Sequence, residues 1–353
     1  MDAAAGDSTP SPFIWLWTLI AALDFHFLAT FFYNQFRPVP YPKHDFSGKT
    51  ILVTGANAGL GFEAARHFAR LNAAKVILGC RDAEKAQHAK AEIERSTGRP
   101  HGVVEAWPLD LTSFDSVREF CSRAGKLDRL DAVVENASVA MVSAEGTLAE
   151  GFECTITVNV ISTFLMALLL LPTLRRTSAK FNTLARLTIV SSEGHIMARF
   201  TEKSAKNIFD AFKSTKVPPD RYQTSKLLQQ FIVQELAEDM SSPISNTKGS
   251  VILNTVNPGF CRTLLFRHNT FPASVALTAI SYLIGRSAEA GSRVLVDAAA
   301  ARPETNGKWL DTCELREPSA YVRSEEGEEM QIRVYEELMR ILEEIEPGIT
   351  RNI

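Results

Sequence analysis

The chain has 353 residues, of which 45% are hydrophobic, and a formal net charge of −3 at pH 7. This length allows one large or two small domains with a sizeable buried core. The near-neutral charge and the lack of a basic run or arm argue against nucleic-acid binding. The five cysteines are scattered and form no Cys-x-x-Cys pair, so we expect reduced thiols rather than a disulfide framework. We find no metal-ligand spacing and predict no metal site.

The N-terminus is small and polar over residues 1–12 and strongly apolar over residues 13–36. The apolar run is about long enough to span a bilayer, and aromatic residues flank it. Asp24 and His26, near its middle, would be costly inside a membrane. Two alternatives stay open: a membrane anchor, spanning or interfacial, and an apolar helix on the surface of the protein itself.

No basic residue precedes this run and no cleavage site follows it, which argues against a secretory signal peptide. If the run spans a membrane, Arg37, Lys43 and Lys49 on its C-terminal side place the catalytic body in the cytosol, for example on the endoplasmic reticulum. Otherwise we expect a cytoplasmic protein. The prolines of Arg37–Pro42 predict a stiff, extended linker.

Strand-like and helix-like patterns alternate along the chain from residue 47 to residue 311. The expected strands are Thr50–Thr54, Lys75–Leu78, Val103–Pro108, Asp131–Glu135, Leu187–Ser191, Val251–Val256 and, more weakly, Lys308–Asp311. The expected helices are Gly61–Leu71, Ala83–Ser96, Ser113–Ala124, Gly151–Leu171, Tyr222–Met240 and Ala288–Ala301. Such alternation predicts an α/β fold, a doubly wound parallel sheet of the Rossmann type, with ligands at the carboxyl ends of the strands.

We expect a single catalytic domain over residues 47–311, preceded by the N-terminal segment 1–46 and followed by a helical extension over 312–353. The apolar run Phe164–Leu171 is too short to span a membrane and predicts a buried helix against the sheet. The tail opens acidic and then repeats apolar residues with helical period from Ile332 to Ile345. This pattern predicts an amphipathic helix that packs on the body, with a homo-oligomer contact as the alternative.

The first strand runs into the stretch Thr54–Gly61, which reads Thr-Gly-Ala-Asn-Ala-Gly-Leu-Gly, and then into a helix. Glycine lets the backbone turn tightly and approach a ligand closely, and a helix N-terminus directs free N–H groups at an anion. A strand, a glycine-rich turn and a helix in this order predict a dinucleotide site. Its expected contacts are Gly55, Asn57, Gly59, Leu60 and Gly61.

Residues at the ends of the next two strands indicate which cofactor binds and how its adenosine half is held. An acidic residue after the second strand would bind the ribose 2′-OH of NAD, whereas an arginine such as Arg81 accommodates the 2′-phosphate of NADP. Asp82 is well placed to cap the helix that begins at Ala83. We therefore prefer NADP(H), with NAD(H) as the alternative. Asp110 either accepts a hydrogen bond from the adenine amine or caps the helix that begins at Ser113.

Tyr222 and Lys226 open a helix and share one of its faces, because they are four residues apart. A phenol has a pKa of about 10, and we expect the neighbouring cation to lower it. A phenol tuned in this way can exchange a proton with an alcohol or a carbonyl. Ser191 and Ser192 end the fifth strand and supply a hydroxyl where the site is expected.

With these motifs in this order, residues 47–311 resemble a short-chain dehydrogenase/reductase, in particular its retinol-dehydrogenase-like and fungal secondary-metabolite members. The resemblance implies that Ser192 polarises the substrate carbonyl and that Tyr222 is the general acid in reduction. Lys226 would lower the pKa of the tyrosine and bind the nicotinamide ribose. Asn159 would complete a proton relay through water.

The same resemblance implies that Pro258 and Thr263 lie beside the nicotinamide. Where the family usually has Asn-Asn-Ala-Gly, this chain has Glu135-Asn136-Ala137-Ser138. Asn136 is retained, so a cofactor contact is expected there. Ser138 has less backbone freedom than the usual glycine.

Two apolar segments adjoin the expected site, and both predict a pocket for a bulky hydrophobic ketone or alcohol. The insert Glu193–Arg221 holds His195, Ile196, Met197, Phe200, Ile208, Phe209 and Phe212; its alternative is a loop packed on itself. Residues 259–287 match the substrate lid of the family and hold Phe260, Leu264, Leu265, Phe266, Phe271 and Tyr282.

The sequence thus predicts an NADP(H)-dependent oxidoreductase that interconverts a hydrophobic ketone and its secondary alcohol by hydride transfer. The resemblance favours a reductase of polyketide or terpenoid biosynthesis. Two alternatives are an NAD-dependent alcohol, retinol or steroid dehydrogenase and a non-catalytic module that senses NADP(H).

Overall fold

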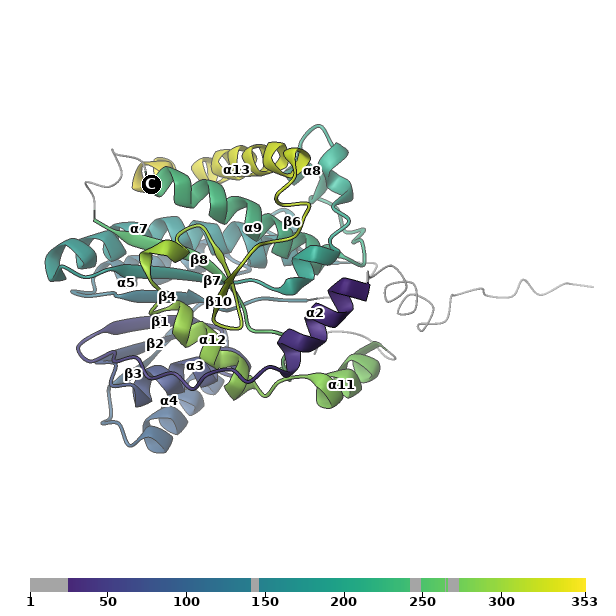
Figure 1. Ribbon diagram of the computed structural model, residues 1–353. Helices are drawn as coiled ribbons and strands as arrows, with labels where there is room; N and C mark the ends of the chain where they lie inside the picture. The colour runs from purple at the N-terminus through teal and green to yellow at the C-terminus, as the bar shows by residue number, and fades with distance from the viewer. Residues whose placement is uncertain (1–24, 141–145, 242–248, 264, 266–272) are drawn as a thin grey trace, which may run out of the picture.

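The computed structural model describes residues 25–140, 146–241, 249–263, 265 and 273–353. At its centre lies an eight-stranded sheet in the order β10-β9-β8-β7-β4-β1-β2-β3 (Figure 1). The strands are β1 (Thr50–Thr54), β2 (Lys75–Cys80), β3 (Val104–Pro108), β4 (Ala132–Glu135), β7 (Ala185–Val190), β8 (Val251–Asn257), β9 (Trp309–Asp311) and β10 (Glu314–Arg316). The pairing is parallel except between β9 and the edge strand β10. The predicted parallel α/β fold is confirmed.

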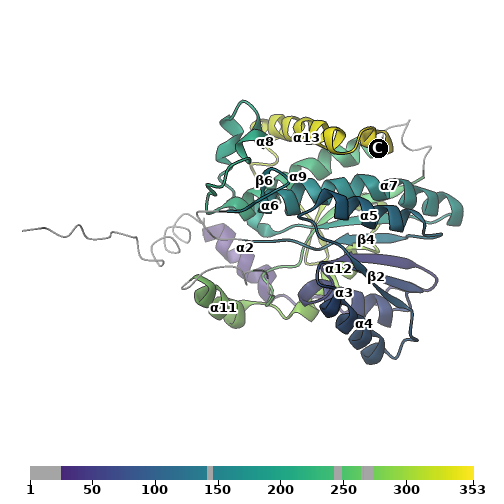
Figure 2. The same cartoon turned by 180° about the vertical axis from the view of Figure 1, so that it is seen from behind.

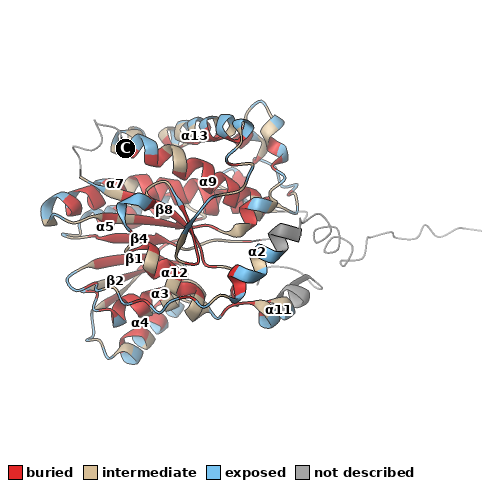
Figure 3. Ribbon diagram, in the orientation of Figure 1, coloured by how far each residue is buried: buried red, intermediate tan, exposed pale blue. Residues whose placement is uncertain are grey.

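Helices cover both faces of this sheet (Figures 1 and 2). One layer holds α3 (Gly59–Arg70), α4 (Ala83–Thr97) and α12 (Ala288–Ala298), and the other holds α5 (Phe114–Gly125), α7 (Ser162–Phe181) and α9 (Arg221–Met240). Successive side chains of a strand point to opposite faces, so Ile51 and Val53 enter the core under α3, whereas Leu52 enters the core under α7. Figure 3 shows the strands and the inner faces of these helices buried.

The helical run Cys154–Phe181 comprises α6 (Cys154–Ile156), a π-helical turn (Thr157–Ile161) and α7. Within the described ranges it is the run that is long and apolar enough to cross a membrane, but 94% of its most apolar window is buried inside the protein. The prediction of a buried helix over Phe164–Leu171 is therefore confirmed.

Several short elements are not predicted from the sequence: β10, the hairpin of β5 (Leu148–Ala149) and β6 (Phe152–Glu153), and α8 (Ile208–Ala211). Elements of two to four residues carry too little periodicity to be recognised. The hairpin turns at Glu150 and Gly151, which both have positive φ.

The N-terminal helix α2 (Phe25–Phe36) ends on the protein body. The Asn34 side chain donates a hydrogen bond to Asp311 Oδ2 (2.9 Å), and Gln35 Nε2 donates to the carbonyl oxygens of Phe260 (2.7 Å) and Ile284 (2.8 Å). The last turn of the predicted anchor is thus held by protein, whereas residues 1–24 lie outside the described residues. Ile284 ends α11 (Ala273–Ile284), which lies beside α2 in both views (Figures 1 and 2).

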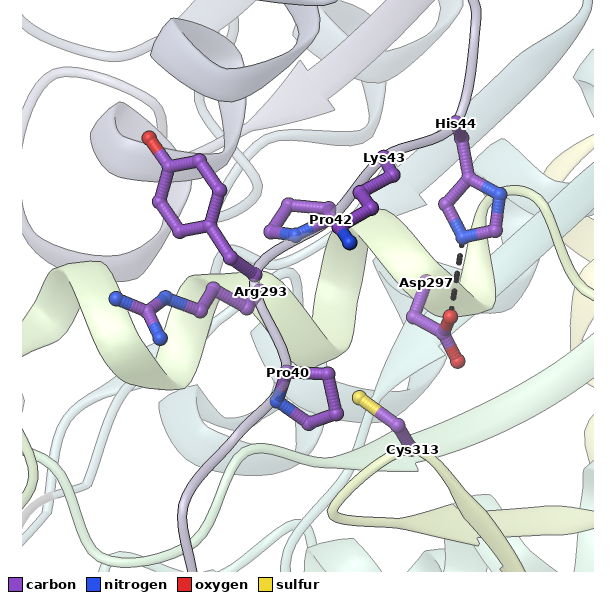
Figure 4. Close-up of a pocket in the computed structure, with 8 residues that line it drawn as sticks. Pro40, Pro42, Lys43, His44, Arg293, Asp297 and Cys313 are labelled. Atoms are coloured by element: carbon purple, nitrogen blue, oxygen red, sulfur yellow. Dashed lines mark hydrogen bonds and ion pairs between the residues drawn. The ribbon is translucent and has the colours of Figure 1, made fainter.

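After α2 the chain follows the outer side of α12. Residues 40–44 border a hollow of about 400 Å³ together with Arg293, Asp297 and Cys313, and His44 Nε2 lies 3.1 Å from Asp297 Oδ1 (Figure 4). None of the predicted site residues lines this hollow. It marks where the linker meets the body.

The insert between Ser192 and Tyr222 packs under the C-terminal helix α13 (Glu325–Ile345). The Glu337 carboxylate on α13 accepts hydrogen bonds from the backbone N–H groups of Ile208 (2.7 Å) and Phe209 (3.2 Å). Four apolar side chains of the insert are at most 1% exposed: Phe200, Ile208, Phe209 and Phe212. The expectation that they line a substrate pocket is wrong, because they form core under α13. The expected packing of the tail on the body is confirmed.

A cluster of buried charged side chains holds this insert in place next to Tyr222. The Arg221 guanidinium lies 2.8 Å from Glu202 and 3.7 Å from Glu153, and the three side chains are at most 8% exposed. Arg221 also lies over the Phe212 ring, with its guanidinium carbon 4.5 Å from the ring centroid. Removal of the Arg221 guanidinium would leave the buried Glu202 and Glu153 carboxylates without a positive charge beside them.

We therefore expect Arg221→Ala to lower the free energy of unfolding by about 3–5 kcal/mol. Arg340→Ala is the matched control, because Arg340 pairs with Glu336 at 3.5 Å on an exposed face of α13 and should cost less than about 1 kcal/mol. Urea unfolding of both variants measures the difference. Equal losses would contradict the assigned role of the cluster.

His195 links the end of β7 to the C-terminal segment. Its Nδ1 lies 2.8 Å from the Ser192 carbonyl oxygen, which can only accept, so Nδ1 carries the proton. Its Nε2 then accepts a hydrogen bond from the backbone N–H of Ser319 (3.1 Å), and the ring meets Trp309 edge-on. Burial lowers the pKa of His195 to about 4, although the bond to Ser192 opposes the shift.

This pKa makes stability depend on pH in a defined direction. Between about pH 6.5, the value of an unfolded histidine, and pH 4, the unfolded chain takes up a proton that folded His195 does not. The contribution of neutral His195, at most about 3 kcal/mol, is full above pH 6.5 and is lost as the pH falls toward 4. The difference in unfolding free energy between wild type and His195→Gln should therefore shrink from pH 7 to pH 4.5. A free-energy difference that stays constant between pH 7 and pH 4.5 would refute the lowered pKa of His195.

Candidate active site

The glycine-rich turn joins β1 to α3 at the carboxyl edge of the sheet. The cap of α3 at Ala58 makes no side-chain hydrogen bond. By contrast, side chains cap four other helices, α4, α5, α12 and α13: Asp82, Ser113, Ser287 and Ser324. The first N–H groups of α3 therefore remain for an anion, as a pyrophosphate site requires.

Close packing explains two of the glycines in this turn. Gly55 has φ +64°, and a Cβ on Gly61 would lie 2.6 Å from both Asn136 Nδ2 and Gly55 O. The Asn136 side chain, at the end of the neighbouring strand β4, donates a hydrogen bond to Thr54 O (2.9 Å). Asn136 thus shapes the turn, and any side chain at position 61 would push it away.

Other predicted cofactor residues surround this turn. Thr263 packs against Gly59, whose added Cβ would lie 3.6 Å from Thr263 Cγ2. The Leu60 side chain points toward α12 and leaves only its backbone for a ligand. The Pro258 carbonyl accepts a hydrogen bond from Arg286 (3.1 Å). Asn57 lies in the turn itself and is half-buried.

Arg81 and Asp82, at the end of β2, have different surroundings. Asp82 Oδ1 accepts a hydrogen bond from Lys85 N (3.0 Å) and caps α4, as expected. Arg81 is exposed, and within the described part of the chain it forms no hydrogen bond or ion pair. Its guanidinium can therefore bind a phosphate without the loss of an internal contact.

Asp110 follows β3 and does not cap α5. The cap is Ser113, and Asp110 Oδ1 instead accepts hydrogen bonds from the backbone N–H (3.0 Å) and hydroxyl (2.7 Å) of Thr112. The contact of Asp110 with the adenine amine stays a prediction.

Ser192, Tyr222 and Lys226 come together where β7 ends. Because β7, β4 and β1 are neighbouring parallel strands, this end lies at the same edge as the glycine turn. Tyr222 is half-buried, and its ring lies beside the Ser192 hydroxyl: a Cβ added to Gly194 would lie 3.3 Å from Ser192 Oγ and 3.7 Å from Tyr222 Cε1. Lys226 is buried, and its Nζ lies 5.5 Å from the centroid of the Tyr222 ring.

The pKa values of this pair differ from the expectation. Burial raises the pKa of Tyr222 to about 12, and the nearby Ser192 hydroxyl opposes the rise. Burial also lowers the pKa of Lys226 to about 7. The expected lowering of the phenol pKa by the ammonium is therefore not found here, because desolvation disfavours both charged forms.

Asn159 lies in the π-helical turn, and hydrogen bonds occupy its side-chain amide on both sides. Its Oδ1 accepts from Ser138 Oγ (3.0 Å) and Val139 N (2.9 Å). Its Nδ2 donates to Val139 O (2.9 Å) and Ser225 Oγ (3.0 Å), and Ser225 in turn donates to the backbone carbonyl of Tyr222. Ser138 has no positive φ, so the departure from glycine adds a hydrogen bond without backbone strain.

Sequence reasoning missed Gln229, three residues after Lys226. Gln229 Nε2 donates a hydrogen bond to the Asn159 carbonyl (2.7 Å), and Lys226 Nζ donates to Gln229 Oε1 (3.3 Å). A buried glutamine in a helix has no distinctive sequence signal, so only the structure identifies it.

The chain is similar to proteins of one family. The family model described as short chain dehydrogenase matches residues 49–193. The chain is 41% identical to the short chain dehydrogenase/reductase dmxR8 of Cryptosporiopsis sp., over 91% of this chain and 99% of that protein. It is 45% identical to the short chain dehydrogenase atnD of Emericella nidulans, over 80% of this chain and 90% of that one.

Solved structures share the fold. A putative short chain dehydrogenase from Pseudomonas syringae has a TM-score of 0.56 and 25% identity and covers 78% of this chain and 100% of its own. A putative short chain dehydrogenase from Shigella flexneri, solved in complex with NADP, has a TM-score of 0.52 and 24% identity, over 77% of this chain and 100% of its own. On the identity and coverage of the fungal relatives, the chain belongs to the short-chain dehydrogenase/reductase family of oxidoreductases, which use a nicotinamide cofactor.

Proposed function

We propose that this protein is an NADPH-dependent reductase that converts a bulky hydrophobic ketone into its secondary alcohol. The observation that carries the proposal is the set of Ser192, Tyr222 and Lys226 at the strand edge that also bears the glycine turn. The residues fit a dinucleotide, because α3 has no side-chain cap and Arg81 is uncommitted among the described residues.

The reaction needs one hydride and one proton at the substrate carbonyl. A bound reduced nicotinamide would supply the hydride for the carbonyl carbon and would itself be oxidised. The Tyr222 hydroxyl supplies the proton to the carbonyl oxygen, toward which Ser192 donates a hydrogen bond. With a pKa of about 12 the phenol is protonated at neutral pH, as the proton donor of a reduction must be.

The proposed substrate class rests on apolar side chains and on the fungal relatives. In the two apolar segments, Ile196 and Tyr282 are exposed and Leu265 is half-buried; Leu264, Phe266 and Phe271 lie outside the described residues. Together with the fungal relatives, these residues support a polyketide or terpenoid ketone. The alternatives are an NAD-dependent alcohol dehydrogenase and a non-catalytic NADP(H) sensor.

Tyr222→Phe should abolish NADPH-dependent reduction and leave NADPH affinity unchanged, because it removes only the proton donor. Turnover is followed by NADPH absorbance with a panel of aromatic, steroid, retinoid and polyketide ketones, and binding by NADPH fluorescence. Retained turnover would overturn the mechanism. A wild type that binds NADPH but reduces no ketone would favour the sensor.

Arg81→Gln should weaken NADPH binding by about 10- to 100-fold and leave NADH binding unchanged, since a charge-assisted phosphate contact is worth about 1.5–3 kcal/mol. Arg95→Gln is the control, because Arg95 pairs with Glu92 at the other end of α4. Tighter binding of NADH than of NADPH by the wild type would refute the NADP preference.

We also propose that residues 13–36 attach the protein to a membrane with the catalytic body in the cytosol. Support comes from exposed apolar side chains on α2 and on its neighbour α11. They are Phe32 (43%), Tyr33 (66%), Phe36 (63%), Tyr282 (68%) and Leu283 (79%). This surface continues the apolar sequence of residues 13–23, so a bilayer that meets one helix would meet both.

The membrane proposal is tested by vesicle flotation of the full chain. The double variant Tyr282→Glu/Leu283→Glu should reduce vesicle binding, because it places charge on the surface that meets the lipid. Ile332→Glu, at an exposed apolar position of α13, should bind like the wild type. Absence of wild-type binding to neutral or anionic vesicles would remove the proposal.

A further inference from the structure

The Lys226 ammonium has two protein acceptors in this structure. Its Nζ donates to the Val190 carbonyl at the end of β7 (2.9 Å) and to Gln229 Oε1, one helical turn further along α9 (3.3 Å). An ammonium has three N–H donors, so one remains for the Tyr222 side of the site.

The nitrogen of the Gln229 side-chain amide contacts the main-chain carbonyl of Asn159. Gln229 Nε2 donates to Asn159 O at 2.7 Å. The three residues are at most 2% exposed. The amide therefore joins Asn159 to Lys226 directly, at the asparagine for which the family resemblance implies a proton relay through water.

We propose that Gln229 is a positioning residue that replaces the relay water between Asn159 and Lys226 and closes that proton path. This inference rests on the proposed reductase function. A water can accept a proton on one side and release one on the other. A primary amide does neither near neutral pH, so this bridge orients Lys226 but does not carry protons.

Tyr222 must then be reprotonated by a route other than the one through Asn159. Tyr222 gives its proton to the substrate oxygen and must regain one proton from water before the next turnover. With the path through Asn159 closed, that proton has to reach the phenol by a route that does not include Asn159. The hydrogen bonds of Asn159 serve to hold Ser138, Val139 and Ser225 in place.

Two substitutions of Gln229 separate the parts of this proposal. Gln229→Met fills the same space without either hydrogen bond, so the ammonium loses an acceptor; NADPH affinity should fall about tenfold. Gln229→Ala removes the whole amide and leaves room for water between Asn159 and Lys226, so turnover should exceed that of Gln229→Met.

Gln230→Met is the matched control. Gln230 is an adjacent buried glutamine whose amide bonds to the hydroxyls of Ser191 (3.1 Å) and Thr255 (3.0 Å) instead of to Lys226. Its loss should lower the melting temperature without a change in NADPH affinity. This control separates a general cost of a missing buried amide from a specific effect on Lys226.

The decisive readout is the dependence of kcat on the deuterium fraction of the solvent, measured with NADPH and a ketone that the wild type reduces. We expect a linear plot, from one transferred proton, for the wild type, and a curved plot, from several protons in a water chain, for Gln229→Ala. NADPH affinity, measured by fluorescence, does not depend on turnover.

A curved plot for the wild type would overturn the proposal, as would Gln229→Met with wild-type NADPH affinity. If Gln229→Met does not fold, the wild-type and Gln229→Ala plots decide alone. If the protein is not a reductase, the wild type will reduce no ketone, but Gln229→Met will still weaken NADPH binding. This pattern differs from every result that overturns the role of Gln229.

Discussion

The hydrogen bonds of the Asn159 amide hold the candidate active site together. Through them, a π-helical turn before α7 is joined to residues 138 and 139 after β4 and to the first turn of α9. Ser225 passes this constraint to the Tyr222 carbonyl. Three segments distant in the sequence are thereby joined at the backbone of Tyr222. An interaction network of this kind tolerates little change, since each lost partner leaves a buried polar group unpaired.

Burial has a second consequence, which concerns charge. The core that positions Tyr222 and Lys226 also removes water from them, so both neutral forms are favoured. A neutral phenol is the form that a carbonyl reductase needs as an acid. The burial that builds the site thus also keeps the proposed proton donor in its protonated form.

The sequence allowed the sheet, the glycine turn and the Tyr222–Lys226 pair to be predicted, because each depends on local periodicity or on fixed spacing. β1 was predicted to the residue, and the other strands of the parallel core to within two residues. Contacts between distant segments could not be predicted. Phe209 and Phe212 suggested a pocket, because pockets and cores use the same apolar residues; only α13, more than a hundred residues later, makes them core. Gln229 looked like any polar helix residue, although its amide is buried against Lys226.

The most direct test of this account is a crystal structure of the wild-type protein with NADPH. We predict pyrophosphate at the N-terminus of α3, the 2′-phosphate beside Arg81, and the nicotinamide ribose within hydrogen-bond distance of Lys226 Nζ, with the Tyr222 hydroxyl facing the reactive carbon of the nicotinamide. A dinucleotide bound elsewhere, or with its nicotinamide turned away from Tyr222, would contradict the account.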